Sequence, residues 1–194
     1  MRVLGCFLGL WTLVLTFWLY WYSARIGGFP DWDGFERVSS ASRIWYDIRH
    51  GDFDNFWQHT HSLVVWPFLH SWLTGALFVV FGPAFTSAEL LSLFAFWGSA
   101  CLIVFLFLRR PTTFAPAGAA AAWGLFITSP IVLYNSVIIM TELFGLFLVL
   151  AILACLPGEE DKRPGRYVAG GILLALLFMF KYNFAGLTWA GLLI

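Results

Sequence analysis

The sequence has little charge for its length. Only 11% of its 194 residues are Asp, Glu, Lys or Arg, whereas 60% are hydrophobic. Soluble domains carry about 25% charged residues, because they must cover a surface that faces water. The composition therefore excludes an ordinary soluble domain and predicts an integral membrane protein. The 11 basic and 11 acidic residues cancel, so no excess of positive charge indicates a nucleic-acid partner.

The sequence is also poor in cysteine. The three cysteines, Cys6, Cys101 and Cys155, all lie in apolar runs, where a thiol is usually a small buried hydrophobic group. Their number and spacing exclude a disulfide framework and a zinc ribbon. A typical signal peptide is lacking too, since Val3–Tyr22 is too long and too aromatic and has no small-residue cleavage site. We interpret Val3–Tyr22 as a retained first membrane helix.

What the chain does have is a series of apolar segments of membrane-spanning length. A spanning helix needs about 20 apolar residues. The sequence predicts one all-α, polytopic transmembrane domain over residues 1–194, with about five spans and a long outer loop at 23–82 that carries juxtamembrane helices. The spans are expected at 3–22, 88–108, 116–135, 138–157 and 167–194. The last apolar run reaches the final residue, so we expect the natural protein to continue beyond it, with a last helix that ends at the far membrane face as the alternative.

Basic residues predict the orientation of these spans. Short loops rich in Lys and Arg tend to stay in the cytoplasm, and Arg109, Arg110 and the Lys162–Arg166 cluster lie in two such loops. Both loops fall on the cytoplasmic side only if Leu63–Phe81 does not cross the membrane. We therefore expect Leu63–Phe81 to lie along the outer face of the membrane, with a true span as the alternative.

The outer loop contains an amphipathic pattern that follows two aspartates. Within Phe35–Arg49, apolar residues recur at helical spacing, and Gly51 is a plausible stop. Asp31 and Asp33 precede this helix, where its dipole stabilises negative charge. The sequence thus predicts carboxylates held near a helix N-terminus just outside the membrane.

Several short motifs follow one another in the chain. They are Asp31-x-Asp33, the helix that closes on Gly51-Asp52, Trp66-Pro67-Phe-Leu-His70, Phe81-Gly82, Thr141-Glu142, and the run Ala169-Gly-Gly that leads to Lys181. Their order resembles the amino-terminal half of the GT-C glycosyltransferases, a superfamily that includes protein mannosyltransferases and the aminoarabinose transferases of lipid A. The resemblance covers nearly the whole chain. Arg37 stands where many members have tyrosine.

The resemblance implies a hexosyl or pentosyl transferase of the bacterial plasma membrane. Its donor would be a sugar on a polyprenyl phosphate, its acceptor a lipid, glycan or protein, and its site would face away from the cytoplasm. The resemblance assigns Asp33 as the general base, with Asp31 as the second candidate. General base catalysis contributes roughly 10²–10⁴ in rate. Attack opposite the phosphate would invert the anomeric centre and need one essential carboxylate.

Four further residues are candidates for substrate binding. Glu142 lies at membrane depth, where a carboxylate costs roughly 2.5–3.5 kcal/mol and is by default a functional candidate. Lys181 ends an apolar run and is a candidate for the donor phosphate. Arg43 and His70 are the other two. The structural alternatives are snorkelling of the charges toward water and, for the aspartates, helix capping.

Metal binding is a separate hypothesis. Carboxylates of Asp31 and Asp33, with or without the imidazoles of His59 and His61, are candidate ligands for Mg²⁺ or Mn²⁺. The sequence also leaves a rival class open: a non-catalytic membrane protein, such as a transporter subunit, a scaffold or a truncated, inactive relative. A transporter would usually show repeated halves, which this sequence lacks.

Overall fold

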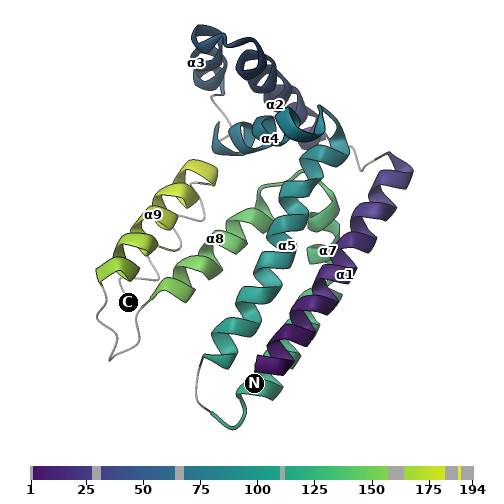
Figure 1. The fold of residues 1–194 in the computed structure, drawn as a ribbon, viewed down its shortest axis with the longest axis vertical. Helices are drawn as coiled ribbons and strands as arrows, with labels where there is room; N and C mark the ends of the chain where they lie inside the picture. Colours follow the sequence, from purple (N-terminus) through teal and green to yellow (C-terminus); the bar gives the residue numbers. More distant parts are fainter. Residues whose placement is uncertain are drawn as a thin grey trace.

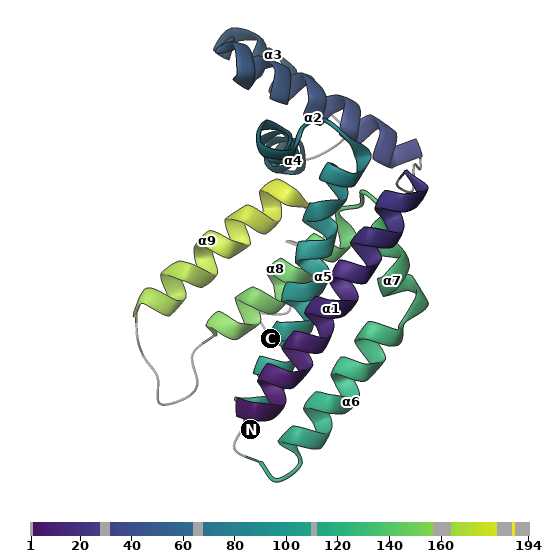
Figure 2. The same cartoon turned by 45° about the vertical axis from the view of Figure 1, so that its right-hand side comes forward.

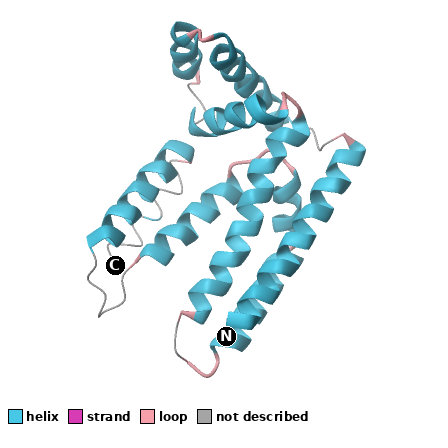
Figure 3. Ribbon diagram, viewed as in Figure 1, coloured by secondary structure: helices cyan, strands magenta, loops and turns pink. Residues whose placement is uncertain are grey.

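The computed structural model describes residues 2–27, 32–63, 68–109, 112–156, 164–181 and 188. Within these ranges every regular element is a helix, as Figure 3 shows, so the all-α prediction is confirmed for them. The helices are α1 (Arg2–Ile26), α2 (Trp32–His50), α3 (Phe53–Ser62), α4 (Phe68–Phe81), α5 (Phe85–Leu108), α6 (Ala115–Thr128), α7 (Pro130–Val137), α8 (Glu142–Cys155) and α9 (Pro164–Phe180).

The helices form two groups. Helices α1, α5, α6, α8 and α9 run up and down through the main body, whereas α2, α3 and α4 lie across one end of it (Figures 1 and 2). We call this second group the α2–α4 layer. The N-terminus and the start of α6 lie at the opposite end of the main body, and α9 starts at the end of the helix that points away from the α2–α4 layer (Figure 1). The basic Arg109 and Arg166 flank two of these segments.

Helix length and composition are compatible with a membrane protein. Among the described residues, Val3–Ile26 and Phe85–Leu108 are long and apolar enough to cross a membrane. Helices α6 and α7 together make a third candidate if the bent pair is one span. Helices α4, α8 and α9 are apolar but have only 14, 14 and 17 residues. The described helices therefore provide two or three candidate spans, fewer than the five that the sequence predicts.

The span expected at 116–135 is broken, which corrects the prediction of one continuous helix. Helix α6 ends at Thr128, Ser129 has extended backbone, and α7 starts at Pro130 with a bend of 59°. Proline disfavours helical conformation in the residue before it and cannot donate a backbone hydrogen bond. The Ser129-Pro130 pair therefore breaks the helix.

The helix expected at 138–157 also starts later than predicted. Helix α8 begins at Glu142, and Ile138 is extended, with φ −108° and ψ 159°. The carbonyl of Ile138 accepts a hydrogen bond from Ser92 Oγ at 2.9 Å, so this non-helical segment is tied to α5. Of the helix expected at 167–194, α9 accounts for 164–180, and 182–187 and 189–194 lie outside the described residues.

Helix α5 is the centre of the main body. Its buried positions are mostly small residues, which let neighbouring helices approach closely; they include Ala88, Ser92, Ala95, Ser99 and Ala100. Phe96 is fully buried on α5 and stacks on Phe126 of α6 at 5.7 Å between ring centroids. At the closest approach to α8, a Cβ on Gly98 would lie 2.6 Å from the Phe147 ring.

Gly98→Ala is expected to lower the free energy of unfolding by about 1–3 kcal/mol, because the new methyl overpacks the α5–α8 contact. Gly171→Ala on α9 is the matched control, since a Cβ there would meet nothing within 4 Å. Alanine favours the helix over glycine, so the control should be neutral or stabilising. Thermal unfolding in detergent measures both, and equal stability of the two variants would contradict the packing account.

Candidate functional site

The candidate site lies where the α2–α4 layer meets the ends of α8 and α9. Helix α2 turns one stripe of residues inward: Gly34, Arg37, Ala41, Ile44 and Asp47. Helix α4 packs closely on this stripe because Gly75 has no side chain. A Cβ at Gly75 would lie 3.2 Å from the carbonyl oxygen of Ala41 and 3.0 Å from Ile44 Cγ2. This packing buries the charged Arg37, which is only 3% exposed.

Glu142 and Lys181 form an ion pair across the ends of two helices. Lys181 Nζ donates to Glu142 Oε1. Glu142 is the first residue of α8, where the helix dipole favours negative charge, and Lys181 directly follows the last residue of α9, where it favours positive charge. The two side chains are 39% and 19% exposed, respectively. The positive charge of Arg37 also acts on Glu142.

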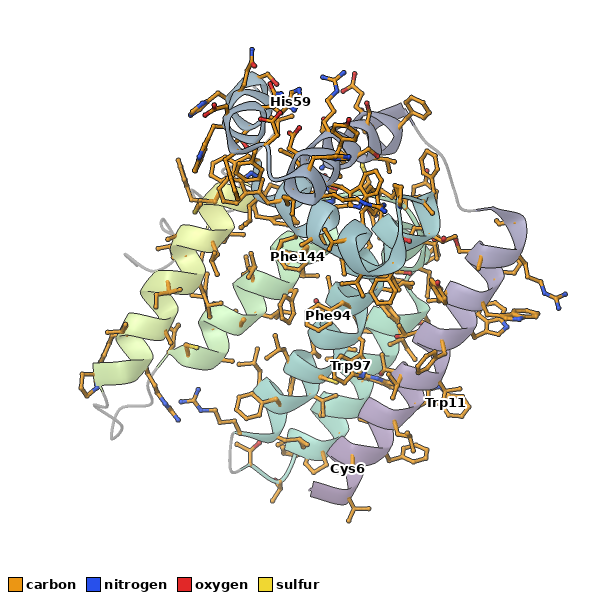
Figure 4. All side chains as sticks on the ribbon, turned by 45° about the horizontal axis from the view of Figure 1, so that its top comes forward. Cys6, Trp11, His59, Phe94, Trp97 and Phe144 are labelled. Atoms are coloured by element: carbon orange, nitrogen blue, oxygen red, sulfur yellow. The ribbon has the colours of Figure 1, made fainter. Side chains whose placement is uncertain are left out.

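Aromatic rings hold this ion pair against α4. Phe180, next to Lys181, stacks on Phe144 of α8 at 4.3 Å between ring centroids. Its other neighbour is the His70 ring of α4, at 5.5 Å in an edge-to-face arrangement. Figure 4 shows Phe144 beneath the α2–α4 layer, with His59 on α3 farther out. The contacts therefore bring together His70, Glu142 and Lys181, three of the predicted substrate-binding residues.

His70 is buried without a hydrogen-bond partner. It is 2% exposed, and neither ring nitrogen has a partner in the described structure. Burial, with the nearby charge of Arg37, lowers the pKa of His70 to about 3. The ring is therefore neutral at physiological pH, with one nitrogen a donor and the other an acceptor. Thr74, one turn along α4, is likewise buried, and its Oγ1 has no partner there.

The low pKa of His70 predicts a pH-dependent stability. Below about pH 6.5 the unfolded chain binds a proton at His70 that the folded protein does not, so folding stability falls as pH falls toward the folded pKa. The loss at His70 should reach about 2 kcal/mol at about pH 5. His70→Gln should remove it. Thermal unfolding of both proteins across this pH window measures the difference, and parallel curves would contradict a buried neutral His70.

Asp33 lies in the first turn of α2 and is partly buried. This helix starts at Trp32, three residues before the amphipathic pattern begins, so Asp33 is inside the helix rather than ahead of it. Asp33 and Arg37 are four residues apart and therefore neighbours on the helix surface. Arg37 in turn acts electrostatically on Glu142 and His70. Asp31, the second candidate base, lies outside the described residues.

The other predicted candidates lie away from the ion pair. Arg43 is exposed on α2. His59 is on α3, where its Nδ1 is 2.6 Å from Asp47 Oδ2, and His61 is exposed beside Trp57. In the described part of the chain, no group of three or more His, Cys, Asp or Glu side chains is arranged to hold a metal. The described residues thus offer no support for the metal hypothesis at His59 and His61.

Sequence reasoning missed three residues near this end of the molecule. Arg37 is four residues from Asp33 and four from Ala41. This helical spacing places Arg37 on the same face of α2 as the buried Ala41 and next to the candidate base, which the sequence alone could have indicated. Thr74 could have been noticed one turn from His70. Glu89, which falls in the span expected at 88–108 but was not named as a candidate, is fully buried near the start of α5, where it accepts a hydrogen bond from Ser23 Oγ. The signal that marked Glu142, a carboxylate inside an expected span, also applied to Glu89 at the start of the span at 88–108.

Comparison with known proteins adds no assignment. A scan against protein-family models, a search of curated proteins and a search of solved structures each found no match for this chain.

Proposed function

We propose that this protein is a membrane glycosyltransferase of GT-C type that moves a hexose or pentose from a polyprenyl phosphate to a lipid, glycan or protein acceptor. One observation carries the proposal. Three polar side chains from distant parts of the sequence, His70, Glu142 and Lys181, gather near the buried Arg37, which lies on the helix that bears Asp33. Charge gathered in so apolar a chain is by default a sign of function.

Asp33, Lys181 and Arg37 have direct roles in this reaction. Asp33 accepts the proton of the acceptor hydroxyl while the acceptor oxygen bonds to the anomeric carbon. The bond from that carbon to the phosphate oxygen breaks, and the polyprenyl phosphate leaves with the electron pair. Lys181, with Arg37 nearby, stabilises the negative charge on the leaving phosphate. Attack from the face opposite the phosphate inverts the anomeric centre.

The orientation of the molecule is part of the proposal. The end that carries Arg109 and Arg166 would face the cytoplasm, in keeping with the positive-inside rule. The α2–α4 layer would then lie on the outer face of a bacterial plasma membrane, where a lipid-linked sugar reaches the site from the outer leaflet. Helix α4 supports this placement, because it buries His70, Ser71 and Thr74 and exposes Val79 and Val80. In lipid, an apolar exposed face is favourable.

The test is transfer by the full-length protein reconstituted in lipid vesicles. The assay presents a panel of synthetic polyprenyl-phosphate hexoses and pentoses with crude membrane acceptors and follows release of the polyprenyl phosphate. Transfer from at least one donor, with inversion of the anomeric centre, is the expected result. If no donor is used and none binds, the protein is a non-catalytic membrane protein such as a scaffold or transporter subunit.

A further inference from the structure

The inner face of α4 carries two polar side chains that the packing leaves unsatisfied. His70 and Thr74 are 2% and 0% exposed, and they are four residues apart, so they lie on adjacent turns of one face. Both nitrogens of His70 and Oγ1 of Thr74 have no hydrogen-bond partner in the described structure. His70 contacts Phe180, and the next residue, Lys181, pairs with Glu142 Oε1. The other carboxylate oxygen of Glu142, Oε2, is buried and has no hydrogen-bond partner in the described structure either.

Such atoms are uncommon in folded proteins. Most buried polar side-chain atoms have a partner, and each exception calls for an explanation. Packing alone gives no reason for a polar pair here, since Leu69, Leu73 and Leu77 of the same helix pack against the hydrophobic core. A phenylalanine at 70 and a valine at 74 would fill similar volumes without unsatisfied atoms. The polar pair therefore indicates a bound group that supplies the missing hydrogen bonds.

The chemistry of these atoms selects the kind of group. A neutral imidazole offers one donor and one acceptor, a threonine hydroxyl donates and accepts, and the free carboxylate oxygen of Glu142 accepts. None of the atoms on α4 carries charge, so they do not form an anion site. The set matches a ligand with several neighbouring hydroxyl groups, each of which both donates and accepts.

We propose that His70 and Thr74 bind hydroxyl groups of the donor sugar and so decide which neutral sugar the protein accepts. This inference rests on the proposed function and adds the specificity-determining residues of the same site. The phosphate of the donor would lie toward Lys181, and the sugar ring would lie beneath α4, between Thr74 and Glu142. Sugars with a charged substituent at the hydroxyl bound by His70 or Thr74 would be rejected, because binding beside these buried side chains would strip water from that charge without pairing it.

The experiment compares wild type with Thr74→Val and His70→Phe, using the donor that wild type uses best and its single-deoxy analogues. In wild type, loss of the hydroxyl that Thr74 contacts should lower kcat/KM by about 5- to 100-fold, because the threonine is then left buried and unpaired. In Thr74→Val, the analogue that lacks this hydroxyl and the parent donor should have nearly equal kcat/KM. His70→Phe should do the same for a different hydroxyl. Thr128→Val, at an exposed threonine of α6, is the matched control and should keep the wild-type pattern.

A binding measurement separates this inference from the proposed function. The thermal stability of each protein is measured with the polyprenyl phosphate alone and with the sugar-bearing lipid. Thr74→Val should keep the stabilisation by the sugar-free lipid and lose most of the extra stabilisation by the sugar. Active variants with an unchanged analogue pattern overturn the inference and leave the transferase standing. A wild type that neither transfers sugar nor responds to either lipid overturns both.

Discussion

Asp33→Asn is expected to lower the rate of sugar transfer by about 10²–10⁴-fold, the range that a positioned general base contributes. Asparagine keeps the size of the side chain and can still form hydrogen bonds in the first turn of α2, but it cannot accept the proton of the acceptor hydroxyl. The measurement is single-turnover transfer from the best donor in vesicles. Donor binding should change little, because the base acts on the acceptor.

One control variant makes this result specific. Glu36→Gln removes a carboxylate from the exposed side of α2, three residues away, and should leave the rate within about twofold if Asp33 acts as the base. Unchanged transfer in Asp33→Asn would show that another carboxylate is the base. Asp31 and Glu142 would then be examined first, and Glu89 next, since it is buried at the same end of the molecule.

Lys181→Met is expected to lower kcat by about 10²–10³-fold, the loss typical when one group that stabilises transition-state charge is removed. Methionine retains most of the volume but no charge, so Glu142 loses its cation and the leaving phosphate loses its counter-charge. Lys181→Arg should recover part of the activity. Transfer rates at saturating donor, with donor affinity measured separately, distinguish an effect on kcat from an effect on binding.

The control for Lys181 is Arg43, an exposed cation of the α2–α4 layer that lies away from the ion pair. Arg43→Met removes one exposed charge of α2 and should leave kcat nearly unchanged, although its place in the loop after the first helix made Arg43 a substrate-binding candidate. Equal losses in Arg43→Met and Lys181→Met would mean that general attraction of an anionic lipid, rather than the ion pair, sets the rate. High salt would then weaken transfer by wild type as well, since salt screens exposed charges.

Local patterns predicted most of the helices and part of the site. Apolar length and turn residues were enough to predict an all-α chain and a helix in the outer loop that ends at Gly51, whose φ is +67°. Glu142 and Lys181 were visible because a charge in an apolar run is rare. The ion pair between them could not be predicted from the sequence, because it depends on how α8 and α9 pack, which no local pattern specifies.

The parts that were missed depend on orientation around helix axes. Ile48 has the spacing of the apolar residues of α2, yet it is 39% exposed, while Arg37 and Asp47 are buried. The face that α2 buries is set by α4 and α3, which lie across it, and not by its own hydrophobicity alone.

The break at Ser129-Pro130 was not predicted from the sequence either. Proline is common in membrane helices, where neighbouring groups often compensate for the lost hydrogen bond, so its presence does not by itself predict a break.

The contact between His70 and Phe180 has a consequence for biosynthesis. His70 lies in the first half of this sequence. Phe180 comes 110 residues later, and Lys181 directly follows Phe180. A ribosome adds about 5–20 residues per second, so the α2–α4 layer would be made seconds before α9 can meet it. A nascent chain would thus carry Asp33 and Arg37 on the outer surface without the lysine that completes the cluster. In the proposed transferase, sugar transfer would begin only after α9 has inserted, so partly made chains would be inactive.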